Sequence, residues 1–315
     1  MTVFRDFHGQ RVSRLGLGCT NFGKRIDAAG VDAVVRAALD AGVTFIDTAD
    51  AYGDGEGEAL LGRALRGRRD EAIIATKFGH DSTAPRAPEE RGGHPANVIS
   101  SAEASLRALG TDRIDLYQMH VPDPQVPVAE TLGALQGLVT QGKVRWIGCS
   151  NVTLAQLEQA GQAAAQRQAG GFQTVQNEYS LLVRDAEQEV LPWCREHDLA
   201  FIPYFPLASG VLTGKYRMDA RVPEGSRVAL MKPDKLFRFF TPRALELVER
   251  IIELGERHGR SPLEYAYGFL LAEPAVLSII SGAMTPGQVE ANAGAAAAAA
   301  ELSGEELDYL RKVSQ

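Results

Sequence analysis

The sequence contains few cysteines and no long apolar run. Its three cysteines, Cys19, Cys149 and Cys194, are widely spaced in 315 residues and form no CxxC pair. We therefore expect neither a disulfide framework nor structural zinc, and a reducing cytoplasm is the simplest setting. The N-terminal residues lack an apolar stretch of signal-peptide length, and no segment approaches the roughly 20 apolar residues of a membrane helix. These absences predict a cytoplasmic protein that does not enter a membrane.

Other absences exclude further classes of function. The net charge is −7, so the overall charge does not favour binding to nucleic acid or to an anionic membrane surface. The six histidines show no HxxxH or HxH spacing, and we expect no catalytic metal. The nucleophile elbow GxSxG of many hydrolases is also absent.

What the sequence does contain is a regular alternation of short apolar runs and longer amphipathic stretches. The expected strands are Leu15–Leu17, Val43–Ile46, Ala72–Thr76, Ile114–Met119, Val144–Gly148, Thr174–Gln176, Ala200–Pro203 and Leu277–Ile280. The expected helices are Ala28–Ala41, Glu58–Arg66, Asn97–Leu109, Val128–Gln141, Leu154–Gln168, Asp185–His197, Pro242–His258 and Gly287–Ala299, with a last helix from Ser303 to Leu310. Alternation of this kind over the whole length predicts a parallel sheet.

Eight such units without a Gly/Ser-rich linker predict a single-domain (β/α)₈ TIM barrel over residues 1–315. The alternative is a doubly wound sheet, but its GxGxxG cue is incomplete because Asn21 stands at the third glycine position after Gly16 and Gly18. Two long connections, Asp81–Pro95 and Leu207–Phe240, follow expected strands. We expect them as long loops over the C-terminal face, although Asp81–Pro95 could equally be a solvated loop without a function.

Four polar residues follow successive expected strands and form a candidate catalytic set: Asp47, Tyr52, Lys77 and His120. In a parallel barrel, residues just past the strands share one mouth. A tyrosine hydroxyl ionises near pH ~10, and a neighbouring lysine lowers that pKa. An aspartate can hold the lysine, and a histidine can hydrogen-bond the reacting oxygen. Each residue alone could be structural, but their joint placement predicts proton transfer to a carbonyl oxygen.

The segments that carry this set resemble the aldo-keto reductases. The matching segments are Asp47–Gly53, Glu58–Leu65, Ala75–Lys77, Asp115–His120, Gly148–Asn151, Gln176–Tyr179, Tyr204–Leu207 and Leu212–Tyr216. The resemblance covers nearly the whole chain, in the order and spacing of that family. It implies that Tyr52 is the general acid in reduction and the base in oxidation. It further implies that Lys77 lowers the pKa of Tyr52, that Asp47 holds Lys77, and that His120 orients the carbonyl.

The resemblance also implies where a nicotinamide cofactor binds. Ser150, Asn151 and Gln176 would hydrogen-bond its carboxamide, and Tyr204 would stack on its ring. Ser150-Asn151 could in addition cap the helix that follows. The phosphates would lie on the small residues and the cation of the segment after Tyr204, which are Leu207, Ser209, Gly210, Thr213 and Lys215. A local basic excess from Lys215 to Arg238 supports an anion site there, although a solvated loop would explain part of it.

A second anion site is expected at the start of the last barrel helix. Gly282 and Thr285 precede this helix, and Gln288 and Asn292 lie one turn apart on it. Another pattern of the family has Lys where Gly282 stands and Arg where Gln288 stands, and those cations would favour a 2′-phosphate. Relatives with Gln and Asn at these positions nevertheless resemble NADP-dependent members. We therefore expect NADP(H) rather than NAD(H).

The substrate pocket is expected to include Asn21, Phe22, Phe78 and Val121. Many family members resemble this chain except for a Trp where Val121 stands, so the pocket should differ in shape. We expect a small-molecule carbonyl or alcohol substrate with an apolar or sugar-like body.

Two other functions stay open from the sequence, and the oligomeric state is undetermined. One is a cofactor-binding regulatory subunit, similar to the ion-channel β-subunits of this superfamily. The other is a barrel isomerase or hydrolase that uses Lys77 and Asp47 without nicotinamide.

Overall fold

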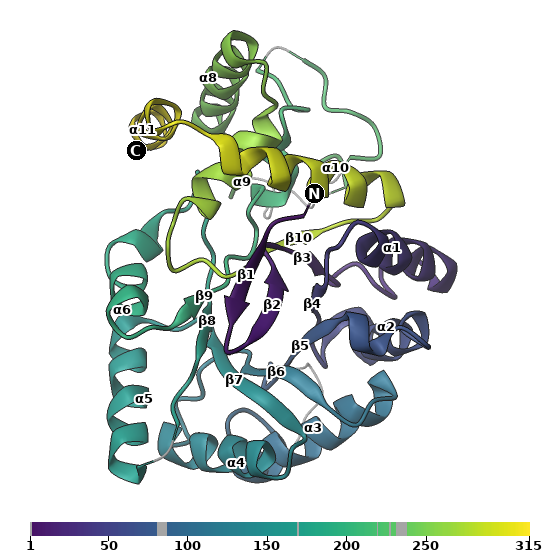
Figure 1. The fold of residues 1–315 in the computed structure, drawn as a ribbon, viewed down its shortest axis with the longest axis vertical. Coiled ribbons are helices and arrows are strands. Elements are labelled where there is room, and N and C mark those ends of the chain that lie inside the picture. Colours follow the sequence, from purple (N-terminus) through teal and green to yellow (C-terminus); the bar gives the residue numbers. More distant parts are fainter. Residues whose placement is uncertain (1, 81–86, 169, 219, 227, 231–237) are drawn as a thin grey trace.

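Eight parallel strands form the centre of the molecule (Figure 1). The computed structural model describes residues 2–80, 87–168, 170–218, 220–226, 228–230 and 238–315. Its strands are β3 (Leu15–Gly18), β4 (Phe45–Asp47), β5 (Ile73–Phe78), β6 (Ile114–Met119), β7 (Val144–Ser150), β8 (Thr174–Gln176), β9 (Ala200–Phe201) and β10 (Ile279–Gly282). Their order in the sheet is β10-β3-β4-β5-β6-β7-β8-β9. All eight expected strands are present, two of them with the expected bounds and the others with ends displaced by at most two residues.

The two edge strands of this sheet also meet, and the sheet closes. The Phe201 backbone N–H donates to the Ala275 carbonyl at 2.8 Å, and the Ile280 N–H donates to the Pro203 carbonyl at 3.0 Å. Isolated parallel bridges join Phe201 to Val276 and Tyr204 to Ile280. The prediction of a (β/α)₈ barrel is therefore confirmed.

Helices surround the strands, and in the described part of the chain two further helices lie outside this ring (Figure 1). The ring contains α1 (Ala28–Asp40), α2 (Gly57–Ala64), α3 (Pro95–Leu109), α4 (Val128–Thr140), α5 (Leu154–Arg167), α6 (Val190–Glu196), α9 (Pro262–Leu271) and α10 (Pro286–Ala298). Outside it lie α8 (Pro242–His258) and α11 (Gly304–Val313). Within the described residues, no helix is long and apolar enough to cross a membrane.

Helix α9 corrects the sequence-based assignment. The expected helix at Pro242–His258 is present as α8, but the ring position belongs to α9, which the sequence did not predict. Residues Tyr265–Leu270 of α9 are all buried, so the helix lacks the polar face that would reveal a 3.6-residue period. The helix expected at Asp185–His197 is also shorter than predicted. Asp185–Glu187 forms a 3₁₀ turn, and α6 begins only at Val190.

The starts of α8, α9 and α10 follow directly from their sequences. Thr241, Ser261 and Thr285 each accept a hydrogen bond from a backbone N–H in the first turn of α8, α9 and α10. A proline follows each of these N-caps, where its missing N–H costs nothing. Thr285 therefore fixes where α10 begins, beside the expected second anion site.

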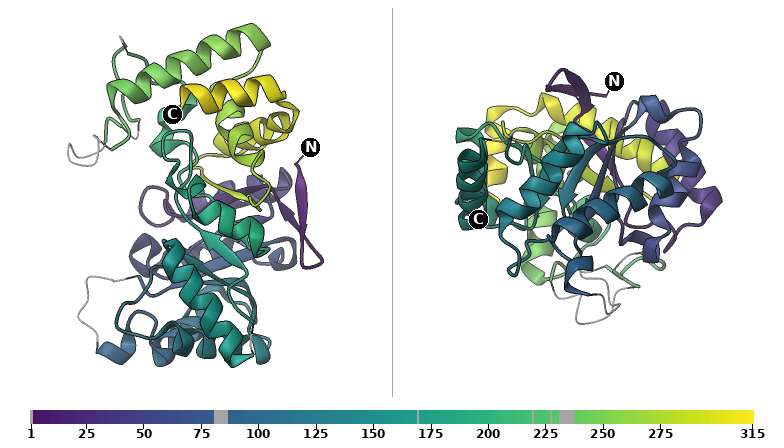
Figure 2. Two further views of the ribbon diagram at one scale, coloured as in Figure 1. Left: turned by 90° about the vertical axis from the view of Figure 1, so that its left-hand side faces the viewer. Right: turned by 90° about the horizontal axis from the view of Figure 1, so that it is seen from below.

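An N-terminal hairpin that the sequence did not predict covers one end of the barrel. Strands β1 (Phe4–Phe7) and β2 (Gln10–Ser13) pair antiparallel around His8 and Gly9, both of which have positive φ. Phe7 and Val12 are buried against inward-facing strand residues, among them Phe45, Leu116 and Trp146. Figure 1 shows the hairpin across the middle of the strand ring, and Figure 2 shows it at one side of the molecule. The hairpin therefore closes the base of the barrel.

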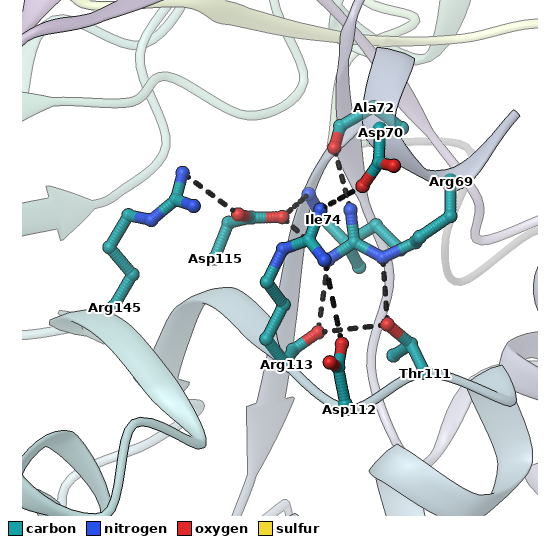
Figure 3. A network of polar contacts seen from close by, with 9 residues as sticks. All are labelled: Arg69, Asp70, Ala72, Ile74, Thr111, Asp112, Arg113, Asp115 and Arg145. Carbon is teal, nitrogen blue, oxygen red and sulfur yellow. Dashed lines mark hydrogen bonds and ion pairs between the residues drawn. The ribbon is translucent and has the colours of Figure 1, made fainter.

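A buried carboxylate ties three strands together near the base (Figure 3). Asp115 on β6 is 2% exposed and accepts from the Ile74 backbone N–H of β5 at 3.0 Å. Arg69 reaches it at 2.7 Å, and Arg145 of β7 lies at 3.2 Å. Buried carboxylates persist when they are paired and hydrogen-bonded, as this one is. The base of the barrel thus holds structural charges, whereas the opposite end holds the candidate site.

We expect close helix packing at Gly62 to be sensitive to a single methyl group. A Cβ at Gly62 of α2 would lie 2.3 Å from the carbonyl oxygen of Leu109 at the end of α3. Gly62→Ala should therefore lower the free energy of unfolding by roughly 1–3 kcal/mol. The control is Gly294→Ala on α10, where no atom lies within 4 Å, and it should stabilise by about 0.5–1 kcal/mol. Urea unfolding of both variants tests this, and equal midpoints would contradict it.

Candidate active site

The alternation of side chains along the strands decides which polar residues meet. Asp47 ends β4, Lys77 lies in β5, Ser150 ends β7 and Gln176 ends β8. Most residues below them on the inward faces are apolar, among them Phe45, Leu116 and Trp146. Asp47, Lys77, Ser150 and Gln176 therefore lie toward the C-terminal ends of the inward faces, where barrel enzymes carry their chemistry.

Lys77 and Asp47 form a buried ion pair at this end. The Lys77 Nζ atom lies 2.8 and 2.7 Å from the two Asp47 carboxylate oxygens and 2.9 Å from the Thr48 carbonyl. The side chains are 1% and 3% exposed. Burial alone would lower the pKa of Lys77, but Asp47 and Tyr52 outweigh it and the pKa is raised. The ammonium therefore stays charged.

Tyr52 stands on the other side of Lys77. The Lys77 Nζ lies 5.2 Å from the centre of the Tyr52 ring. The chain turns sharply after Tyr52, where Gly53 has φ +61° and Asp54 has φ +55°. A Cβ at Gly53 would lie 2.3 Å from the Phe22 carbonyl oxygen, so this turn requires glycine.

The pKa of Tyr52 is raised, whereas the sequence predicted that Lys77 would lower it. Burial raises its pKa above 10, and the charge of Asp47 acts in the same direction. Lys77 pulls the pKa down as expected, and hydrogen bonds with Thr20 and Lys77 act likewise, but the balance remains upward. Without bound ligands the hydroxyl is therefore a protonated acid rather than a phenolate at neutral pH.

His120 lies beside Tyr52 and is neutral. The two rings are edge to face with centroids 6.0 Å apart, and the His80 ring lies 4.7 Å from His120. Burial, Lys77 and His80 lower the pKa of His120 to about 3. Its Nδ1 atom is buried and has no hydrogen-bond partner among the described residues. A neutral imidazole of this kind can donate one hydrogen bond to a substrate oxygen.

The four residues expected to hold a nicotinamide are also brought together. The Tyr204 hydroxyl donates to Asn151 Oδ1 at 2.7 Å, and Asn151 Nδ2 donates to the His120 carbonyl at 2.9 Å. The Ser150 hydroxyl donates to the Gln176 carbonyl at 2.7 Å. Asn151 has φ +58°, a strained conformation that recurs at functional sites.

The segment expected to cradle phosphates has an unusual backbone. Ala208, Ser209 and Gly210 have φ of +45°, +60° and +91°, within the 3₁₀ segment Ala208–Thr213 that begins after Leu207. The Thr213 hydroxyl donates to the Gly210 carbonyl at 2.8 Å. The Lys215 Nζ lies 3.3 Å from where a Cβ of Gly210 would be, so a cation stands against this loop.

The segment around Lys215 carries less unpaired positive charge than its number of basic residues suggests. Arg217 pairs with Glu249 at 2.5 Å, and Arg238 pairs with Glu178, so these two cations are already neutralised. Arg227, Lys232 and Lys235 lie outside the described residues. Among the described cations of this segment, exposed Lys215 and Arg221 form no ion pair.

The expected second anion site at α10 is partly exposed. Gly282 and Thr285 are exposed, and Gln288 Oε1 accepts from the Met284 backbone N–H at 2.8 Å. Asn292 is 9% exposed, and its Nδ2 donates to Ser281 Oγ at 3.3 Å. Gln288 therefore faces outward, whereas Asn292 lies deeper on the same helix face.

The expected substrate residues fall into two groups: two lie near the strand ends, and two are buried in the hydrophobic core. Asn21 and Val121 are half-buried near the strand ends, and Asn21 Nδ2 lies 3.6 Å from where a Cβ of Gly282 would be. Phe22 and Phe78 are completely buried in the outer hydrophobic core and do not line an open pocket. Phe78 follows inward-facing Lys77, so alternation points it outward, where its ring packs 4.7 Å from Tyr117.

Two residues at the mouth were missed by sequence reasoning. Thr20, which interacts with Tyr52, comes two residues after β3 and could have been found by inspecting every strand end. His80, which lies against His120, follows β5 by two residues and was hidden by the long loop after it. Among the described residues, no group of three or more His, Cys, Asp or Glu could hold a metal ion.

Comparison with known proteins decides the family. The profile of the Aldo/keto reductase family matches residues 14–315. This chain belongs to that family. It is an NAD(P)-dependent oxidoreductase of the aldo/keto reductase type, and the family acts on small carbonyl substrates.

Curated relatives agree with this assignment. Aldo-keto reductase YhdN of Bacillus subtilis is 35% identical over 294 residues, covering 90% of this reductase and 85% of the relative. Probable aldo-keto reductase 1 of Glycine max is 34% identical, covering 92% and 82%. A protein of Oryza sativa subsp. japonica, named probable voltage-gated potassium channel subunit beta, is 31% identical, covering 98% and 94%.

Proposed function

We propose that this reductase is a single-domain cytoplasmic enzyme that uses NADP(H) to interconvert a carbonyl and an alcohol. Its substrates would be aldehydes, ketones or sugar-like carbonyls, with Tyr52 as general acid in reduction and general base in oxidation. The observation that carries the proposal is the buried Lys77 ammonium, which lies between the Asp47 carboxylate and the Tyr52 ring. A charged lysine at 1% exposure is costly to maintain, and a proton-transfer role for Tyr52 accounts for it.

Each residue of this set has a distinct task in carbonyl reduction. A nicotinamide bound beside Ser150, Asn151, Gln176 and Tyr204 would supply the hydride for the carbonyl carbon. The Tyr52 hydroxyl gives its proton to the carbonyl oxygen, which becomes the alcohol oxygen. The Lys77 ammonium stabilises the phenolate that remains on Tyr52, and Asp47 keeps that ammonium in place. Neutral His120 donates a hydrogen bond to the same oxygen and orients the substrate.

The residues present fit a nicotinamide dinucleotide. Ser150, Asn151 and Gln176 offer neutral amide and hydroxyl groups, which suit a carboxamide. Tyr204 is half-buried and offers an aromatic surface for a flat ring. The left-handed residues Ala208–Gly210, with Lys215 against them, suit a diphosphate because small residues and one cation allow close approach.

A regulatory role remains the second candidate. Its support is the resemblance to plant proteins named probable voltage-gated potassium channel subunit beta, at 31% and 30% identity over 98% of this chain. The arrangement of Asp47, Tyr52 and Lys77 favours turnover, because a subunit that only binds cofactor does not require a proton donor. Measured turnover separates the two candidates.

A carbonyl panel tests the proposed reaction. The purified protein would be mixed with NADPH and a series of aldehydes, ketones and aldoses, and the loss of reduced-cofactor absorbance would be followed. We expect turnover with at least one carbonyl class and none without a carbonyl. Tight NADPH binding without turnover on any substrate would favour the regulatory role instead.

We expect NADPH to be preferred over NADH, with a moderate and salt-sensitive preference. The 2′-phosphate would meet exposed Gln288, backbone N–H groups at the start of α10 and a cation such as Lys215, because Arg217 is paired with Glu249. Neutral donors give about half the strength of charge-assisted bonds, and salt screens an exposed lysine. Paired fluorescence titrations with both cofactors at low and high ionic strength measure this. An NADH preference would contradict it.

A substitution at Gly282 provides the control for this prediction. A Cβ at Gly282 would meet its nearest atoms at 3.6 and 3.7 Å, which is ordinary contact, so Gly282→Lys should fit. An added charge-assisted bond should raise the NADPH preference by roughly tenfold or more. An unchanged preference would show that Gly282 does not face the 2′-phosphate.

A further inference from the structure

A series of hydrogen bonds links the proposed nicotinamide platform to the backbone of Gln176, whose side chain contacts the catalytic ion pair. It runs from the Tyr204 hydroxyl to Asn151 Oδ1 at 2.7 Å, and from Asn151 Nδ2 to Ser150 Oγ at 3.0 Å. The Ser150 hydroxyl then donates to the backbone carbonyl of Gln176 at 2.7 Å. The series therefore reaches Gln176 at the end of β8.

The side chain of Gln176 makes a separate hydrogen bond to Asp47. Its Nε2 donates to Asp47 Oδ1 at 2.9 Å, the same oxygen that accepts from Lys77 Nζ at 2.8 Å. Gln176 and Asp47 are each 2% exposed, so water does not compete strongly for these bonds. Gln176 and Lys77 thus share one carboxylate oxygen, and a stronger bond to one weakens the hold on the other.

We propose that Gln176 is a positioning residue that couples cofactor binding to the proton affinity of Tyr52. The proposal rests on the proposed function, in which the Gln176 side chain also contacts the nicotinamide carboxamide. An amide whose oxygen accepts a hydrogen bond is a better N–H donor, because hydrogen bonds in series polarise one another. When Gln176 Oε1 accepts from the carboxamide, its Nε2–H withdraws more negative charge from Asp47. The Lys77 ammonium is then less neutralised and stabilises the Tyr52 phenolate more.

The direction of the coupling follows from linkage. Cofactor binding lowers the pKa of Tyr52, so ionised Tyr52 must in turn bind the cofactor more tightly by the same factor. A shift of one pKa unit corresponds to about a tenfold change in affinity. The affinity for NADPH should therefore rise with pH as Tyr52 ionises. NADPH is the appropriate probe because its reduced ring carries no positive charge that could lower the Tyr52 pKa directly.

Other groups near Tyr52 have to be separated from this effect. The titratable groups that interact with Tyr52, Lys77 or Asp47 include Cys19 after β3, Glu58 in α2, His120 after β6 and Tyr204 after β9. Asp50 in turn interacts with Glu58, and His80 lies against His120. His120, with a pKa of about 3, does not change charge in the relevant range. Burial raises the pKa of Tyr204 to about 12. A Tyr52→Phe variant removes the Tyr52 contribution and leaves all the others.

The experiment is NADPH affinity, measured by cofactor fluorescence, from neutral pH to the highest pH at which each variant stays folded. The four proteins are the wild type, Tyr52→Phe, Gln176→Met and Ser150→Ala. Ser150→Ala is the matched control, because it removes a proposed carboxamide contact without a bond to Asp47. We expect a several-fold rise in affinity with pH in the wild type and in Ser150→Ala, and a flat profile in Tyr52→Phe and Gln176→Met.

The outcomes distinguish this proposal from the proposed function. Weaker NADPH binding in Gln176→Met with the wild-type dependence on pH would overturn the coupling and leave the cofactor site intact. Unchanged affinity in both Gln176→Met and Ser150→Ala would overturn the cofactor site and the coupling with it. Folding of Gln176→Met is expected, since Asp47 keeps both of its bonds to Lys77.

Discussion

Replacing Tyr52 with phenylalanine should reduce carbonyl turnover by roughly 10²–10⁴-fold and leave NADPH affinity at neutral pH close to that of the wild type. The hydroxyl is the proposed proton donor, and neighbouring His120, with a pKa of about 3, is a neutral imidazole at neutral pH and can offer a hydrogen bond but no imidazolium proton. Removing one oxygen leaves the ring and its packing in place, so binding should persist. Steady-state rates and cofactor fluorescence titration measure the two effects separately.

The matched control for this variant is Tyr309→Phe. Tyr309 lies on α11, outside the barrel ring, where its ring is 5.8 Å from the Arg257 guanidinium. Its loss of a hydroxyl should leave turnover at the wild-type level. If Tyr52→Phe retained activity within a few-fold of the wild type, the general acid would have to be another group.

Replacing Lys77 with methionine should have a second large effect, on both catalysis and stability. Lys77 lowers the pKa of Tyr52 against the effect of burial, so its loss should raise that pKa further. Alcohol oxidation needs ionised Tyr52, and its rate at neutral pH should fall about tenfold for each unit of that rise. The basic limb of the pH–rate profile should move to higher pH, and an unchanged limb would show that Lys77 is not coupled to Tyr52.

Stability requires a separate variant, because Lys77→Met leaves Asp47 buried without its cation. Breaking a buried pair on one side costs about 3–5 kcal/mol of unfolding free energy. The double variant Asp47→Asn with Lys77→Met removes both charges and should recover a large part of that loss, while catalysis stays impaired. Chemical denaturation of the two variants checks this, and equal stabilities would contradict it.

The barrel strands, and the proximity of the candidate catalytic residues, could be predicted because they depend on local patterns. Short apolar runs at regular intervals mark the barrel strands, and Asp47 and Lys77 lie at the ends of two of them. A parallel barrel brings such ends together without further information. The hairpin β1–β2 was not predicted, because its strands have four residues each and contain few apolar residues to mark them as strands.

What could not be predicted depends on contacts that only the folded chain creates. The pKa of Tyr52 is the sum of burial and nearby charges, and the sequence shows only the charges. The face occupied by Phe78 follows from the register of β5, and a shift of one residue reverses it. The pairing of Arg217 with Glu249 joins residues of two different elements, so a count of basic residues in one segment overestimates its free charge.

The hairpin β1–β2 also has a consequence for the kinetics of this reductase. Because Phe7 and Val12 pack against the apolar residues inside the barrel, we expect ligands to reach the candidate site from the opposite end. Ser150 and Gln176, at 1% and 2% exposure, lie deeper than half-buried Asn21 and Val121. If Ser150 and Gln176 hold the nicotinamide, as proposed, a carbonyl held near Asn21 and Val121 would cover it from the open end. We therefore expect the cofactor to bind before the carbonyl and to be released after the alcohol.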